Sequence, residues 1–339
     1  MINELTTPPA IHPLSQSQRW PYFFVSMAVV FPLLVGLGFI PDYIVISSGV
    51  ITPHWFTHVH GAIMTSWLLM FFTQSFLAAR GNIKYHRQLG QWGAALGGLV
   101  IVTLIATTIR RRFGIWYPVE DSVWDIFVIE LYLTTLFAAF FIWGIAARKD
   151  SKTHKRLLLL ASLIITAAAT DRIRFLPGTS PITKFGYVDI LLVPLFIYDY
   201  LTLKKIHRIT IIGTLSIAVL QGLAAIAWGS PAWHNIGYSI FAPFSTAPIE
   251  TKLTTAQINS ILGDYGDKNW HLSIEADQGK LYLIMPGEPN KELGTTSADE
   301  LFVRTAAWRI KFEKGPDGRM IKMKHLQPDN LRWEVVRYR

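Results

Sequence analysis

Three histidines lie close together at the start of a long apolar segment: His54, His58 and His60, in the sequence HWFTHVHG. Neutral imidazole binds zinc and haem iron, so histidines grouped in this way can form a metal site. On a helix, His54 and His58 are four residues apart and share a face, whereas His60 faces elsewhere. If this stretch is helical, a single ion therefore cannot be held by all three histidines.

A zinc site at this position needs oxygen ligands from another segment. Catalytic zinc sites combine nitrogen and oxygen ligands and keep one position open. Asp125 and Glu130 begin a later apolar segment, and either can supply a carboxylate to His54 and His58. The alternative is a polar collar at the membrane interface, in which aspartate and arginine residues pair and close the helix bundle.

A second group of residues is a candidate for binding haem b. His86 and His154 each lie in or beside a basic loop, and two histidines from neighbouring helices at equal depth form a bis-histidine haem site. His60, Gln74 and Arg80 are candidates for the same cofactor, or for a quinone. The alternative is that His86 and His154 are loop residues that contact lipid phosphate.

Further ionisable residues lie within or beside the apolar segments. A charged side chain at the centre of a bilayer costs about 3 kcal/mol or more, so each of these residues is a candidate for a functional or structural role. They are Arg87, Arg156, Arg172, Asp189, Asp199 and His207.

The apolar segments that position these residues dominate the composition. The chain of 339 residues is 51% hydrophobic and 16% charged, whereas soluble proteins carry about 25% charged residues. We predict an all-α membrane bundle of seven transmembrane helices, in which glycines of GLGFIPD and GGLVIVTLIA permit close helix packing. The predicted spans are residues 22–40, 56–79, 91–109, 123–147, 156–176, 187–203 and 209–228.

A small antiparallel β domain is predicted to follow the bundle. The segments WHLSIEA, KLYLIM, ELFVR, WRIKFEK, RMIKMKHL and RWEVVRY are short and strand-like, and turn residues separate them, which favours a barrel or sandwich. We expect His271 and His325 to lie on its surface. The predicted units are an N-terminal segment 1–20, a membrane domain 21–230, a linker 231–249 and the β domain 250–339.

The distribution of positive charge predicts the orientation. Most lysine and arginine residues of the short loops, such as Lys84, Lys149 and Lys205, lie on the side of the N-terminus, which is therefore expected to be cytoplasmic. Seven crossings then place the β domain outside a bacterial inner membrane. Arg110–Arg112 lie on the opposite side and are interpreted as an interfacial anchor. The net charge of +9 follows from these loops and does not indicate nucleic-acid binding.

The segment VHGAIMTSWLLMFFTQSFLAARGNIKYHRQLGQWG resembles part of a group of uncharacterised bacterial multi-pass membrane proteins. Two later segments, HKRLLLLASLIITAAATDRIR and DILLVPLFIYDYLTLKKIHR, are similar to later helices of that group. The resemblance covers most of residues 50–215 and implies a membrane bundle, but no activity. A fainter similarity, His-x-x-Gly beside glutamine-bearing helices, is to transmembrane b-type cytochromes. The residues that match the pattern of the multi-pass membrane protein group are His60-Gly61, Gln74, Arg80, and His86-Arg87 with Gly90.

The C-terminal region carries a separate resemblance. The stretches GDYG, GKLYLIMPGEP, DELF and RIKFEKGPDGRMIKMKHLQP resemble the small β domain appended to many secreted serine β-lactamase-like hydrolases. That domain is accessory in those proteins. The resemblance therefore implies a fold and an extracytoplasmic location, and no catalytic residue.

Three functions stay open at this point. The first is a membrane redox protein that binds haem b or quinone within the bundle and exchanges electrons with a membrane partner. The second is a zinc-dependent hydrolase acting on a lipid or an amide at the outer face. The third is a non-enzymatic sensor or assembly factor whose β domain binds a ligand. The absence of cysteine excludes thiolate ligands and iron–sulfur clusters from all three.

Overall fold

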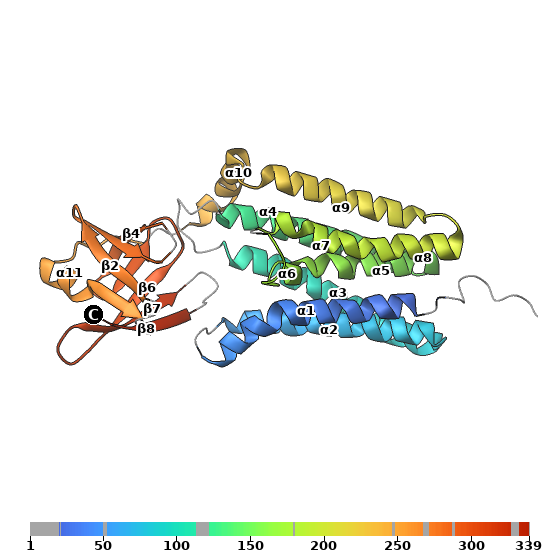
Figure 1. The fold of residues 1–339 in the computed structure, drawn as a ribbon, viewed down its shortest axis with the longest axis horizontal. Helices are drawn as coiled ribbons and strands as arrows, with labels where there is room; N and C mark the ends of the chain where they lie inside the picture. Colours follow the sequence, from blue (N-terminus) through green and yellow to red (C-terminus); the bar gives the residue numbers. More distant parts are fainter. Residues whose placement is uncertain are drawn as a thin grey trace, which may run out of the picture.

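The computed structural model describes a helical bundle followed by a C-terminal β domain (Figure 1). The described residues are 20, 22–49, 53–112, 122–178, 180–245, 248–266, 271–286, 289–326 and 332–338. Glu120 and Asp121, which precede the predicted fourth span, lie outside them. Within the described residues, an antiparallel β domain follows the helical bundle along the chain, as the sequence predicts.

Among the described residues, six helical segments are long and apolar enough to cross a membrane, which is the architecture of a multi-pass membrane protein. The stretch Ile182–Leu203 is not uniform, because it consists of η2 (Ile182–Lys184), α7 (Phe185–Asp189), η3 (Ile190–Leu192) and α8 (Val193–Leu203). The other five are α1 (Phe23–Ser47), α2 (Trp55–Ala79), α3 (Ile83–Arg110), α4 (Ser122–Ala146) and α9 (Arg208–Ala227).

The predicted fifth span does not form one helix of spanning length. It is divided into α5 (Ser151–Ile165) and α6 (Ala167–Thr170), which are separated at Thr166. The Thr166 hydroxyl donates a hydrogen bond of 2.6 Å to the carbonyl oxygen of Leu163, so the side chain competes with the regular helical pattern. Six of the seven predicted spans are therefore confirmed as long apolar helices.

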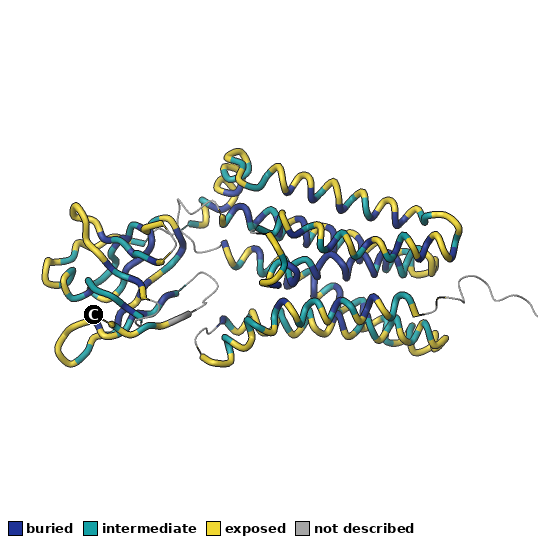
Figure 2. Tube along the Cα trace, in the orientation of Figure 1, coloured by how far each residue is buried: buried dark blue, intermediate teal, exposed yellow. Residues whose placement is uncertain are grey.

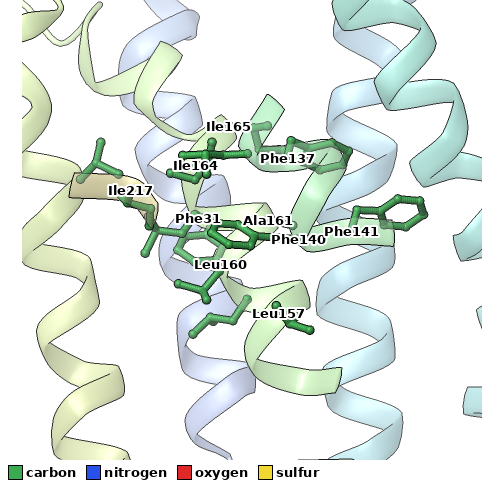
Figure 3. Close-up of a cluster of buried hydrophobic side chains, with 14 of the residues drawn as sticks. Phe31, Phe137, Phe140, Phe141, Leu157, Leu160, Ala161, Ile164, Ile165 and Ile217 are labelled. Carbon is green, nitrogen blue, oxygen red and sulfur yellow. The ribbon is translucent and has the colours of Figure 1, made fainter. Parts of the chain in front are cut away.

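The helix α5 is the centre of the bundle. It packs against α1, α2, α4 and α9, and nearly every residue from Arg156 to Ile165 is buried. Phe31 of α1, Phe137 of α4 and Ile217 of α9 pack in the same cluster as Leu160 of α5 (Figure 3). Exposed residues follow the outward faces of the helices (Figure 2), and many of them are large and apolar, as a lipid environment requires.

Two glycines allow neighbouring elements to approach closely. A Cβ atom at Gly38 would collide with the backbone carbonyl of Ala169 in α6, and one at Gly97 would collide with the ring of Phe141. Small residues at such contacts let backbones pack closely where the hydrophobic effect does not drive association. The predicted packing role of these glycine-containing segments is confirmed at both positions.

The segment predicted as a linker is partly helical. Pro231–Phe241 form α10, and Ala242–Phe244 form η4. Trp233 of α10 donates a hydrogen bond of 2.8 Å to the carbonyl oxygen of Trp124 in α4, and Gly237 packs on the Trp124 ring. The prediction missed the start of α10, although Pro231 after Ser230 is a typical first residue of a helix.

The β domain is one antiparallel sheet in which every strand pairs with the next in sequence. Tyr265 and Arg337 form a bridge, and the Tyr338 N–H donates to the carbonyl oxygen of Asp264 at 2.7 Å, which joins the last strand to the first. The short helix α11 (Thr255–Ile261) precedes the sheet. The strands are β1 (Gly263–Gly266), β2 (His271–Asp277), β3 (Lys280–Ile284), β4 (Lys291–Ser297), β5 (Glu300–Val303), β6 (Arg309–Lys314), β7 (Met320–Leu326) and β8 (Arg332–Val336).

The interior of the sheet is filled by side chains, and it contains a histidine. His271 is exposed as predicted, but the prediction that His325 lies on the surface is wrong, because it is 2% exposed. Successive strand residues face opposite sides, so His325 points to the same interior as Met323, two residues earlier. Burial lowers the pKa of His325 to about 4, which keeps the ring neutral at physiological pH.

We expect Gly38→Val to destabilise the bundle by about 1–3 kcal/mol, because the added side chain must displace the backbone of Ala169. The measurement is the thermal unfolding midpoint in detergent, followed by intrinsic fluorescence. Gly98→Val is the matched control, since nothing lies within 4 Å of a Cβ atom at Gly98. Equal midpoints for the two variants would contradict the close α1–α6 contact.

Candidate functional site

Two of the predicted haem ligands, His86 and His154, come together at one end of the bundle. The turn between α2 and α3 contains Gly81 with a positive φ of 74°, and it brings His86, one turn into α3, back beside the end of α2. Asp150 caps α5 by accepting a hydrogen bond of 3.0 Å from the Lys152 N–H, and His154 lies one turn into that helix. The ring centres of the two histidines are 6.4 Å apart, with planes at 89°.

Backbone carbonyl groups hold both rings. His86 Nδ1 lies 3.2 Å from the carbonyl oxygen of Gln74, and His154 Nδ1 lies 2.8 Å from that of Gly144. A carbonyl oxygen only accepts hydrogen bonds, so Nδ1 is the donor in each ring and a neutral imidazole keeps its lone pair on Nε2. Histidines that bind metals are held in this way, with the second nitrogen donating to a carbonyl or carboxylate group.

The neighbours of the pair include a glutamine side chain with unused hydrogen-bonding capacity. Gln74 Nε2 lies 3.8 Å from the Sδ of Met70, and Gly90 of α3 faces the same amide. Among the described residues, the buried Gln74 Oε1 has no hydrogen-bond partner. Thus Gln74, His86 and Gly90, which the sequence motif combines, are also neighbours in space.

A glycine allows α5 to approach α4 at this point. A Cβ atom at Gly144 would lie 2.9 Å from Leu158 Cδ2 and 3.3 Å from Leu157 Cβ. The close contact lets the Gly144 carbonyl reach His154. No sequence motif around Gly144 indicated this role, because the contact depends on how the two helices pack.

The remaining haem candidates lie elsewhere. His60 is near the opposite end of α2, and fourteen residues of helix separate it from Gln74 by about 21 Å along the axis. His60 therefore cannot share a ligand with His86 and His154. Arg80 is exposed at the end of α2, where it lies 5.3 Å from the centre of the Phe76 ring, and Arg87 is exposed on α3.

The turn of α2 that carries His60 packs on α1. The Tyr43 hydroxyl lies 2.7 Å from the position of a Cβ atom at Gly61, so the glycine next to His60 does allow α1 to come close. Arg172, which follows α6, lies 3.5 Å from Asp42 of α1 through its Nε and stacks on the Phe39 ring. In the described part of the chain, His60 Nδ1 is buried without a hydrogen-bond partner.

The predicted zinc ligands are not brought together. His54 caps α2, where its Nδ1 accepts a hydrogen bond of 3.2 Å from the Phe56 N–H, and His58 is exposed. Glu130 accepts from Arg111 at 3.1 Å and from the buried Arg112 at 2.5 Å. Within the described ranges, no three histidine, aspartate or glutamate side chains are placed to hold a metal ion.

Asp125 has a partner that the sequence interpretation missed. Its Oδ1 accepts hydrogen bonds from the Gly229 N–H at 2.7 Å and from His234 Nε2 at 2.9 Å. His234 lies on α10, in the segment that the sequence predicts to be a linker. The arrangement ties α4 to α10 and resembles the predicted collar of paired polar groups more closely than a metal site.

Three of the other ionisable candidates form one buried network. Arg156 of α5 donates to Asp199 Oδ1 of α8 through Nε at 2.9 Å and also through Nη2, and both side chains are at most 1% exposed. Asp199 Oδ2 accepts from the His207 N–H at 2.9 Å and from the Thr210 hydroxyl at 2.5 Å. Burial, together with Arg156, lowers the pKa of His207. The network joins α5, α8 and the start of α9.

Comparisons of the chain with protein families, curated proteins and solved structures found no match. The two resemblances described above therefore stay predictions.

Replacing one partner of the buried ion pair, as in Arg156→Leu or Asp199→Leu, is expected to cost about 3–5 kcal/mol of unfolding free energy, because the other charge stays buried and unpaired. The double variant should lose less than the sum of the single variants. Unfolding midpoints in detergent measure this coupling, with the exposed Arg87→Leu as control. Additive effects would contradict a direct pair.

Proposed function

We propose that this chain is a membrane redox protein that would hold haem b between α3 and α5 through the imidazoles of His86 and His154. The observation that carries the proposal is the pairing of these rings, each held through Nδ1 by a backbone carbonyl group. The same two residues are the pair that the sequence favours, since both open a helix after a basic loop.

The separation of the rings agrees with this role. Two bonds of about 2 Å between metal and imidazole nitrogen, together with the radii of both rings, place the ring centres roughly 6 Å apart when the ligands lie on opposite sides of one iron. The observed distance is 6.4 Å. The separation also lies within the range of an edge-on contact between two rings, so it is compatible with a shared ligand without requiring one.

Each neighbouring residue has a part in holding the group. The carbonyl groups of Gln74 and Gly144 orient the imidazoles and raise the basicity of Nε2. The free Oε1 of Gln74 is available to accept a hydrogen bond. Arg80 and Arg87, exposed at the same end, can pair with the carboxylate groups of haem. Bound haem would supply one-electron chemistry at this position.

The visible absorption spectrum of the detergent-purified, dithionite-reduced protein tests this proposal. The protein from haem-replete cells should show the bands of six-coordinate haem b. His86→Ala and His154→Ala should each lower the haem-to-protein ratio about tenfold or more, because the one histidine of the pair that remains cannot replace the lost ligand.

His58→Ala is the matched control, since His58 is an exposed histidine on α2. Size-exclusion profiles show whether each variant is folded. A colourless wild-type preparation that also fails to take up added haem would overturn the proposal, and so would a normal spectrum in both ligand variants.

We also propose that α5 and α6 together complete a seventh crossing, with the N-terminus in the cytoplasm of a bacterium and the β domain outside its inner membrane. Support comes from Figure 1, in which α1 begins at the end of the bundle opposite the β domain, as an odd number of crossings requires. The excess of basic residues in the loops on the N-terminal side is the second support.

Protease added to sealed right-side-out cells should remove the β domain, residues 250–339, and leave the bundle intact. The measurement is an immunoblot against a C-terminal epitope. Inverted vesicles provide the control, because the epitope should be protected in them. Digestion confined to the inverted vesicles would contradict the proposed orientation.

A further inference from the structure

A groove of about 230 Å³ lies between α9 and the segment from α7 to α8, away from the histidine pair. Its walls are mainly apolar, and Val193 and Ala218 on its rim are exposed on the outer surface of the bundle. In a membrane this surface faces lipid, so the groove is accessible from the bilayer. It is lined by Asp189, Leu192, Val193, Phe196, Thr214, Ile217, Ala218 and Gln221.

One end of the groove carries a hydrogen-bonded polar group. Asp189 Oδ1 accepts a hydrogen bond of 2.9 Å from Gln221 Nε2, and the same amide nitrogen lies 3.2 Å from the Tyr132 hydroxyl of α4. In the described part of the chain, no lysine, arginine or histidine pairs with Asp189. A carboxyl group without a cation in an apolar segment is costly, and such groups mark functional sites in membrane proteins.

The second polar group of the groove is the Thr214 hydroxyl, seven residues before Gln221 on α9. The Thr214 hydroxyl is buried, and among the described residues it has no hydrogen-bond partner. A buried hydroxyl group without a partner costs about 1–3 kcal/mol, so its presence requires an explanation. Thr214 and Gln221 are seven residues apart on α9, which places them on one face of the helix and about 10 Å apart along its axis.

We propose that this groove binds the head of a lipid-soluble quinone or its quinol. The two oxygens of such a ring lie on opposite sides, roughly 5 Å apart, and a hydrogen bond of about 2.8 Å at each end gives a span of roughly 11 Å. This span is close to the axial separation of about 10 Å between Thr214 and Gln221 on α9. The flat apolar ring fits the walls formed by Leu192, Phe196 and Ile217.

The charge and polarity of the groove favour a quinone over a phospholipid headgroup or an acyl chain. A phospholipid phosphate group would lie against the Asp189 carboxyl group, which no cation offsets in the described residues. A bare acyl chain would leave the Thr214 hydroxyl unsatisfied. A quinone accepts a hydrogen bond from Thr214, and a quinol donates one to Asp189. The binding site involves α9 and α7–α8, so it does not depend on haem bound between α3 and α5.

Equilibrium dialysis of the detergent-purified chain against a short-chain benzoquinone with one isoprenoid unit tests the proposal. Ala218→Phe, which fills the groove, should weaken binding about tenfold or more. The control is Val219→Phe, because Val219 is the next residue, is 60% exposed and does not line the groove. Thr214→Val preserves shape and should weaken binding about fivefold, the effect of one lost hydrogen bond.

The outcomes separate this proposal from the haem proposal. Quinone binding that is lost in Ala218→Phe and kept in His86→Ala supports the groove as the quinone site. This holds whether or not the visible absorption spectrum shows bound haem. Equal affinity in Ala218→Phe and Val219→Phe, or in wild type and Thr214→Val, would overturn it. The proposal would also be overturned if a short-chain phosphatidylcholine displaced the bound quinone as effectively as added quinone does.

Discussion

The burial of α5 on all sides is the constraint on which the bundle depends. Lipid cannot satisfy polar groups, so every polar side chain of this central helix needs a partner from the protein. Arg156 finds Asp199, Ser162 accepts a hydrogen bond from Trp67 at 3.2 Å, and His154 donates to the Gly144 carbonyl. Each partner comes from a different helix, so these polar contacts also determine how the helices are arranged around α5.

The same constraint produces the candidate site. The close contact of α5 with α4, which Gly144 permits, holds His154 at the level where α3 begins. The tight turn at Gly81 returns His86 to that level. The two imidazoles are therefore positioned by helix packing and by backbone carbonyl groups, and not by flexible loops. A site built in this way is rigid before any ligand binds, which is the property that a redox centre requires.

The polar side chains of the bundle are of two kinds. Some form ion pairs or hydrogen bonds between helices, and others have no partner within the described residues and are free to bind a ligand. At the β-domain end of the bundle, Glu130 is paired with Arg111 and Arg112, and Asp125 is paired with His234. Glu130 neutralises the two arginines, and the two carboxylates connect α3, α4 and α10. In contrast, Gln74 Oε1 and the Thr214 hydroxyl have no partner in the described part of the chain. The unused groups lie beside the histidine pair and in the lipid-facing groove, which are the two places where we infer ligands.

The sequence by itself determined the six apolar spans, the antiparallel β domain and the candidacy of His86 and His154, because hydropathy, strand alternation and loop charge are local properties. It did not determine that the fifth span is interrupted at Thr166, that His60 lies far from His86, or that Glu130 forms an ion pair with Arg112. Those outcomes depend on which helix faces are in contact, and a nearly uniform apolar surface does not specify its neighbours. Only the tertiary structure decided them, since pairing in lipid depends on small residues such as Gly38 and Gly144 and on matched polar groups such as Arg156 and Asp199.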